Sequence, residues 1–198
     1  FEKVENSLGF HVIVDYAHTP ESLQKLLTLL RELSPDSRII AVSGSAGERD
    51  VPKRALQGGV SARLTDFSIF TNEEPRFENA ADIIEQIAAG AIAAGAKPGR
   101  DFVMIVERTE AIATAIGVAQ PGDIVLLAGK GHERSIIWNG EKIPWDEAAV
   151  ATQALRAAGY SRDVRSTVSC FGRSARPTST NCCSSIGEGA SNIRSTPR

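Results

Sequence analysis

Short apolar runs alternate with longer segments of helical periodicity over the first 160 residues of the chain. The apolar runs predict five buried strands, at 10–14, 38–43, 66–71, 102–106 and 123–128. The periodic segments predict five helices, at 20–33, 51–64, 80–94, 110–119 and 147–159. Strands that alternate with helices are typical of an α/β domain, so we expect a mostly parallel sheet of about six strands with helices on both faces.

Polar and glycine positions refine the bounds of the helices. Thr19 before Pro20 is a typical N-cap, and Thr109 takes the same place before the fourth helix. Gly58 and Gly90 each interrupt a helical pattern, and a glycine in a helix interior lowers the stability of the helix. We therefore expect a well-defined first helix and weaker second and third helices.

A hairpin is expected after the fifth strand. Its parts are 135–138, the turn Asn139-Gly140 and 142–145. Asn-Gly is the strongest short signal for the type I′ turn that joins two antiparallel strands. Trp138 and Trp145 stand at the two ends of the hairpin, where cross-strand packing accounts for them. Asp146 then caps the last helix.

The pattern stops after Tyr160, and the composition changes with it. The net charge of −2 divides into +4 over residues 162–198 and −6 over the rest. The last segment is rich in Ser, Thr, Arg and Gly without a sustained period, which is typical of disorder. We expect one domain at 1–160 and a disordered tail at 161–198. The abrupt change suggests a shifted reading frame or a remnant of cloning.

Charge, hydropathy and cysteine positions exclude several classes of function. An acidic body disfavours nucleic acid as the main partner. No apolar stretch approaches the roughly 20 residues that a membrane span requires. All three cysteines lie in the tail, so the body suits a reducing compartment and cannot be a disulfide scaffold. We expect a cytoplasmic protein with no nucleic-acid partner, no membrane partner and no metal site in this chain.

Charged loops follow three of the predicted strands. They are Asp15–Pro20, Thr71–Arg76 and Gly129–Glu133. The carboxyl ends of parallel strands meet at one edge of a sheet, and open α/β sheets bind their ligands there. The two glycines of the third loop would let its backbone approach a bound group closely. The sequence therefore predicts a binding site assembled from these loops.

A glycine-rich loop, Ser43–Gly47, follows the second predicted strand and resembles a phosphate-binding loop. It lacks the Gly-Lys-Ser/Thr ending of a P-loop, and the chain contains no GxGxxG fingerprint. The alternative is a simple tight turn. Arg49 favours a binding role, because a planar guanidinium suits a carboxylate or a phosphate.

Other loop residues admit two interpretations. His18 and His132 are either polar loop residues or ligand-binding groups at the shared edge. The glutamates of the segment Glu73–Glu78 form either a solvated acidic turn or, together with Pro75-Arg76, a shaped binding loop.

Five motifs occur here in the order that they take in the Mur ligase family: Asp15–Pro20, Gly47–Asp50, Asn72–Arg76, Gly129–Glu133 and Pro144–Asp146. Residues 1–160 resemble the C-terminal domain of those members that add the third amino acid in peptidoglycan synthesis. The resemblance implies a Rossmann-like domain of an ATP-dependent acid–amino-acid ligase. In such enzymes the N-terminal domain binds the UDP-MurNAc-dipeptide, and the central domain holds ATP and Mg²⁺. This chain alone is then expected to be inactive.

The resemblance implies roles in holding the amino acid. Arg49, Arg76, Gly129 and Glu133 match positions that bind meso-diaminopimelate, with the arginines on its carboxylates and the Gly129 carbonyl and Glu133 on an ammonium group. The usual motif Asp-Asn-Pro-Arg is Glu-Glu-Pro-Arg here, so Glu74 replaces the asparagine. Arg76 favours diaminopimelate over lysine, the alternative amino acid. Glu74 is then expected to face the distal ammonium group or to point away.

The resemblance also implies an ATP side. Asp15 would contact the ATP ribose, with Tyr16 and His18 nearby. Lys130 and His132 are further candidates for either substrate.

Two other functions stay open from the sequence. One is a free-standing module that binds an amino acid or a nucleotide without catalysis. The other is a sibling ligase of the same superfamily that uses a different amino acid. A P-loop encoded upstream of Phe1 would favour a ligase, and a start codon there would favour the module.

Overall fold

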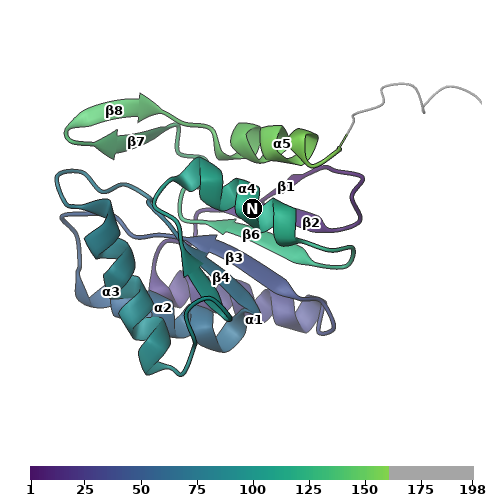
Figure 1. Ribbon diagram of the computed structural model, residues 1–198, viewed down its shortest axis with the longest axis horizontal. Coiled ribbons are helices and arrows are strands. Elements are labelled where there is room, and N and C mark those ends of the chain that lie inside the picture. The colour runs from purple at the N-terminus through teal and green to yellow at the C-terminus, as the bar shows by residue number, and fades with distance from the viewer. Residues whose placement is uncertain (161–198) are drawn as a thin grey trace, which may run out of the picture. The chain divides into compact units, whose positions relative to one another are not determined.

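A sheet of six strands runs through residues 1–160, the part of the chain that the computed structural model describes (Figure 1). The strands are β1 (Glu2–Val4), β2 (His11–Asp15), β3 (Ile39–Ser43), β4 (Phe67–Phe70), β5 (Phe102–Met104) and β6 (Ile124–Ala128). Their order is β1-β2-β6-β3-β4-β5, and every neighbouring pair is parallel except β1–β2. The expected mostly parallel α/β architecture is confirmed.

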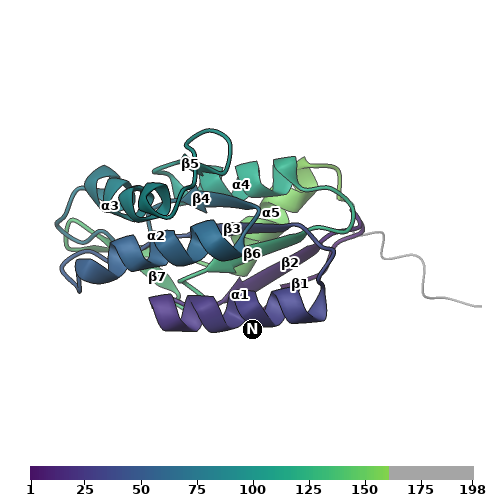
Figure 2. The ribbon, with the colours of Figure 1, turned by 90° about the horizontal axis from the view of Figure 1, so that it is seen from below.

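Helices cover both faces of this sheet. They are α1 (Pro20–Leu33), α2 (Pro52–Leu64), α3 (Ala80–Ala93), α4 (Arg108–Val118) and α5 (Glu147–Ala157). Figures 1 and 2 show α1, α2 and α3 on one face and α4 and α5 on the other. Alternate residues of the central strands feed two apolar cores, as β6 shows with Val125 and Leu127 toward α4 and Ile124 and Leu126 toward α1. Burial on both faces explains why the strands read as continuous apolar runs.

Two of the three predicted helix caps are confirmed. Thr19 Oγ1 accepts a hydrogen bond from the Ser22 backbone N–H at 3.2 Å, and Asp146 Oδ1 accepts one from Ala149 at 2.9 Å. The prediction for Thr109 is wrong. Helix α4 begins at Arg108, two residues before the predicted start, and its N-cap residue Glu107 makes no side-chain capping bond.

Gly58 and Gly90 bring α2 and α3 into close contact. A Cβ on Gly58 would lie 1.9 Å from the Ile87 carbonyl oxygen, and a Cβ on Gly90 would lie 1.9 Å from that of Ala55. The two glycines therefore join the helices, although each costs some intrinsic helix stability.

The hairpin is confirmed as β7 (Ser135–Trp138) and β8 (Glu141–Pro144), with positive φ at both turn residues. The predicted cross-strand packing is wrong for Trp145. Trp138 pairs with Glu141, whereas Trp145 lies beyond β8 and packs against the core under α4 and α5.

The tail predicted at 161–198 lies outside the described residues. Among the helices of the described part, none combines the length and the hydrophobicity that a bilayer span requires.

Candidate functional site at the strand ends

Four loops that follow β2, β3, β4 and β6 enclose a hollow of about 520 Å³. Its lining residues are Tyr16, His18, Thr19, Ala46, Arg49, Asp50, Lys53, Glu73, Glu74, Arg76 and Glu133. The loops thus meet at one edge of the sheet, as predicted from the strand pattern. Of the other candidate residues, Lys130 is buried beneath the hollow, while Asp15 and His132 line two smaller hollows next to it.

Backbone hydrogen bonds hold Arg76 in a left-handed conformation with φ of 56°. Its N–H donates to the Ile137 carbonyl at 3.0 Å, and its own carbonyl accepts from the Asn139 N–H at 2.7 Å. The hairpin β7–β8 therefore fixes the point from which the Arg76 side chain extends. On the other side, the Gly47 N–H donates to the Glu74 carbonyl at 2.8 Å and joins the loop after β3 to the loop after β4.

Alternating charges form a chain across the floor of the hollow. Arg76 donates to Glu74 Oε1 from Nε at 3.1 Å and from Nη2 at 2.9 Å. Lys130 Nζ lies 3.5 Å from the other Glu74 oxygen and 2.5 Å from Glu133 Oε2. Glu74 thus does not point away from the hollow, because it pairs with two cations of the protein itself, and its approach to an ammonium group of the substrate stays a prediction. The four charges balance, which is how a buried lysine such as Lys130 avoids an uncompensated charge.

Gly129 and Gly131 let the last loop pack against two other loops. Both have positive φ, at 110° and 47°. A Cβ on Gly129 would lie 2.8 Å from Glu73 Oε2, and one on Gly131 would lie 2.8 Å from the Tyr16 Cβ. A side chain at Gly131 would press on the Tyr16 backbone, and one at Gly129 would displace the Glu73 side chain, at a positive φ that favours glycine in both cases.

Glu73 is buried, with 5% of its surface exposed, so the interpretation of this segment as a solvated acidic turn is wrong. Its Oε2 atom has no hydrogen-bond partner among the described residues. Burial raises the pKa of the Glu73 carboxyl, against the opposing effect of nearby Arg108, Lys53 and Lys130. Glu78 differs, because hydrogen bonds from Arg54 lower its pKa.

Glu73→Gln is expected to stabilise the domain progressively as the pH rises. At low pH the Glu73 carboxyl is neutral in both the folded and the unfolded chain, so the substitution changes no charge. Above the ordinary value of 4.5, the unfolded chain loses this proton before the folded one, and the buried charge then costs folding free energy. Denaturant unfolding from pH 4 to pH 8 measures this. The exposed Glu85→Gln is the control, and a gain that is flat or falls with pH would contradict the burial of an ionising Glu73.

An aromatic cluster borders the hollow on the side of β2. The Tyr16 ring centroid lies 4.5 Å from that of His18 and 5.2 Å from that of His132. The Tyr16 hydroxyl donates to Glu133 Oε1 at 3.4 Å. Burial and the Glu133 charge together raise the Tyr16 pKa above its ordinary value. Asp15 Oδ1 accepts from the Ala17 N–H at 2.9 Å, which shapes the start of this loop.

Helix α2 contributes residues that the sequence analysis missed. Lys53 Nζ and Gln57 Nε2 both donate to the His18 carbonyl, at 3.3 Å and 3.0 Å. Arg54, fully buried, pairs with Glu78 at 2.8 Å. The spacing of Lys53 and Gln57 places them on one face of the helix and could have indicated their shared direction. Arg49 is exposed at the rim and makes no ion pair among the described residues, so it is available to an anionic ligand.

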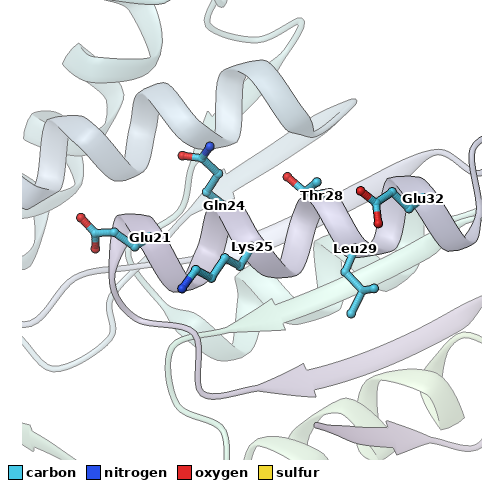
Figure 3. Close-up of a pocket in the computed structure, with 6 residues that line it drawn as sticks. All are labelled: Glu21, Gln24, Lys25, Thr28, Leu29 and Glu32. Atoms are coloured by element: carbon cyan, nitrogen blue, oxygen red, sulfur yellow. The ribbon is translucent and has the colours of Figure 1, made fainter.

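A second hollow, of about 480 Å³, lies along the outer face of α1. Within residues 1–160, its lining comes from α1, and Figure 3 shows carboxylate, amide, amine, hydroxyl and apolar side chains that do not converge on one point. No strand end or glycine loop contributes to it, so the hollow at the strand ends is the candidate site.

Comparison with known proteins places the chain in a family. The family described as "Mur ligase, glutamate ligase domain" matches residues 1–131. The UDP-N-acetylmuramyl-tripeptide synthetase of Roseiflexus sp. (strain RS-1) is 52% identical over 159 residues, which are 80% of this chain and 31% of the relative. The UDP-N-acetylmuramoyl-L-alanyl-D-glutamate--2,6-diaminopimelate ligase of Geobacillus kaustophilus (strain HTA426) is 43% identical over 159 residues, 80% of this chain and 32% of the relative.

A solved structure of a UDP-N-acetylmuramoyl-L-alanyl-D-glutamate--2,6-diaminopimelate ligase superposes with a TM-score of 0.70 at 31% identity, covering 79% of this chain and 31% of that one. The chain thus spans about a third of the length of the relatives that it matches. By sequence and by fold, the chain belongs to the Mur ligase family.

Proposed function

We propose that residues 1–160 are the C-terminal domain of an ATP-dependent ligase that adds the third amino acid to UDP-N-acetylmuramoyl-L-alanyl-D-glutamate in peptidoglycan synthesis. The observation that carries this proposal is the hollow at the strand ends, where fixed cations and carboxylates gather in a chain of the Mur ligase family. The names of the Roseiflexus and Geobacillus relatives support it.

The amino acid that we propose is meso-diaminopimelate, the substrate in the name of the Geobacillus relative. A zwitterion with two carboxylates and two ammonium groups suits a site with both kinds of charge. Arg49 and Arg76 would bind its carboxylates, and Glu133 with the Gly129 carbonyl would bind an ammonium group. Arg76 would share its guanidinium between Glu74 and the distal carboxylate.

The proposal places ATP on the side of the aromatic cluster. Asp15 would contact the ribose, with Tyr16 and His18 beside it. His132 is the third member of the aromatic cluster. Mg²⁺ and the γ-phosphate are assigned to the central domain of the full-length enzyme. Among residues 1–160, no three His, Cys, Asp or Glu side chains gather closely enough to hold a metal ion.

The contribution of this domain to the reaction is positioning. ATP activates the γ-carboxylate of the D-glutamate residue by phosphorylation. The amine of the incoming amino acid, freed of its proton, then attacks the activated carbon; a C–N bond forms, the acyl C–O bond breaks and phosphate leaves. Residues of the hollow would hold that amine at attacking distance, which can supply much of the rate enhancement. Closure of this domain over the central one would exclude water.

An activity assay tests the proposal. The full-length ligase should form ADP, phosphate and the tripeptide product from UDP-MurNAc-dipeptide, meso-diaminopimelate and ATP with Mg²⁺. The present chain alone should form none, because its sequence contains no P-loop to hold the γ-phosphate during transfer. Product from the chain alone would refute the division of roles, and no product from the full-length enzyme with any amino acid would refute the function.

Glu74→Asn should leave the use of meso-diaminopimelate unchanged or improve it. The substitution frees Nε and Nη2 of Arg76 for the distal carboxylate. Lysine should stay a poor substrate, because it offers Arg76 no carboxylate. The measurement is kcat/KM of the full-length enzyme for both amino acids. Glu74→Gln is the control, because it removes the charge and keeps the length of the side chain. Loss of diaminopimelate use in Glu74→Asn would contradict this prediction and show that the site requires the Glu74 carboxylate.

A further inference from the structure

Arg108, the first residue of α4, carries a guanidinium that is almost fully buried, with 1% of the side chain exposed. It donates to Glu147, the first residue of α5, from Nη2 at 2.6 Å and from Nε at 3.0 Å. Glu147 is buried as well, and its Oε2 also accepts from the Trp145 indole N–H at 2.6 Å. The carboxylate therefore fixes the plane of the guanidinium.

The remaining hydrogen bonds of Arg108 go to two backbone carbonyls. Nη1 donates to the carbonyl of Asn72 at 3.2 Å, and Nη2 donates to that of Ala128 at 2.9 Å. Asn72 directly precedes the loop of Glu74 and Arg76, and Ala128 directly precedes the loop of Gly129 and Glu133. One side chain thus holds the carbonyl directly before each of the two loops that the proposed function assigns to the amino acid. None of its hydrogen bonds goes to the ATP-side loop, residues 15–20, of the described chain.

A buried ion pair is an inefficient way to stabilise a fold. Its desolvation cost often cancels its attraction, and apolar residues of similar volume commonly do as well. What a guanidinium offers instead is a rigid fork of five donors with fixed directions. Here that fork sets the distance between two loops, a geometric requirement that a leucine or methionine pair could not meet.

We propose that Arg108, oriented by Glu147 and Trp145, is a positioning residue that sets the spacing between the two loops of the amino-acid site. This inference rests on the proposed function for its meaning in catalysis. The coupling itself can be measured without any activity: Arg108 should affect the loops 73–78 and 129–134 and have no effect on the loop 15–20.

Amide hydrogen exchange on this chain provides the first test. Arg108→Lys keeps the positive charge but loses the fork, so exchange in 73–78 and 129–134 should quicken about tenfold or more while exchange in 15–20 stays the same. Arg31→Lys is the matched control. Arg31 also binds two carbonyls and a carboxylate, those of Leu64, Ser37 and Asp66, but it does so before the amino ends of β3 and β4. It should leave all three loops unchanged.

A second variant keeps the test valid if Arg108→Lys fails to fold. Arg108→Met with Glu147→Gln removes both buried charges and keeps an oxygen for the Trp145 N–H, so it should fold and show the same loop-specific exchange. Equal quickening of all three loops, or no change in any of them, would overturn the inference. So would a failure of both variants to fold, because Arg108 would then be needed for the fold itself.

Kinetics of the full-length ligase provide the second test. In either variant the KM for the amino acid should rise about ten- to a hundredfold, since small displacements of positioning groups cost that much, while the KM for ATP stays unchanged. A wild-type enzyme that forms no product would refute the proposed function, and the exchange experiment would still test the coupling between the loops. Wild-type amino-acid KM in a folded variant would overturn the positioning role alone.

Discussion

Arg76→Ala in the full-length ligase is expected to raise the KM for the incoming amino acid about ten- to a hundredfold, because it removes a charge-assisted contact to a carboxylate. The KM for ATP should change little, since the proposed nucleotide groups, Asp15 and His18, lie on a different loop. The hairpin holds the Arg76 backbone at positive φ through two hydrogen bonds. The point from which the side chain extends into the hollow is therefore fixed without a ligand. Steady-state kinetics with each substrate varied in turn measures both constants.

Arg76→Lys is the graded control for this prediction. Lysine keeps the charge and bears the same left-handed backbone, but it cannot make two parallel hydrogen bonds. Its amino-acid KM should fall between those of wild type and Arg76→Ala. Equal increases in both KM values would instead assign Arg76 to domain closure.

Gly58→Ala is expected to lower the melting temperature by about 5–10 °C. The new methyl group would meet the Ile87 carbonyl at 1.9 Å and the Ala91 nitrogen at 2.9 Å, and both are backbone atoms that cannot turn aside. Forcing apart two packed helices costs about 1–3 kcal/mol or somewhat more. In a domain of this size each kcal/mol corresponds to about 2–4 °C.

Gly117→Ala is the matched control for Gly58. It is also a helical glycine, in α4, but a Cβ there would meet nothing within 4 Å. Removing an exposed helix glycine should raise stability by up to about 1 kcal/mol. Scanning calorimetry measures the melting temperature of both variants. A similar change in both would mean that intrinsic helix propensity, rather than the contact between α2 and α3, determines the effect of Gly58→Ala.

The pattern of apolar runs was sufficient to predict the sheet and the edge at which its loops gather. Each central strand is buried on both faces, so its sequence is a continuous apolar run that can be recognised without knowledge of its neighbours. Strand β1 escaped prediction because Glu2–Val4 is too short to show alternation. It forms only by pairing antiparallel with β2.

The charged residues inside the domain were harder to predict. Arg108 shares a helical face with the buried Ala111 and Ala115, and Glu147 shares one with Ala151, so helical spacing could have placed both in the core. Charged side chains are rarely buried without a partner, and the partner here lies 39 residues away. Glu73 is similar, because only the fold shows that the Gly129 loop covers it.

If the hollow at the strand ends selects the third amino acid, a competition assay should reveal that selection. The full-length ligase receives UDP-MurNAc-dipeptide, ATP, Mg²⁺ and equal amounts of meso-diaminopimelate and L-lysine, and mass spectrometry identifies the product. We expect the diaminopimelate product from wild type and a clear loss of that preference in Arg76→Ala. A lysine product from wild type, or an undiminished preference without Arg76, would contradict it.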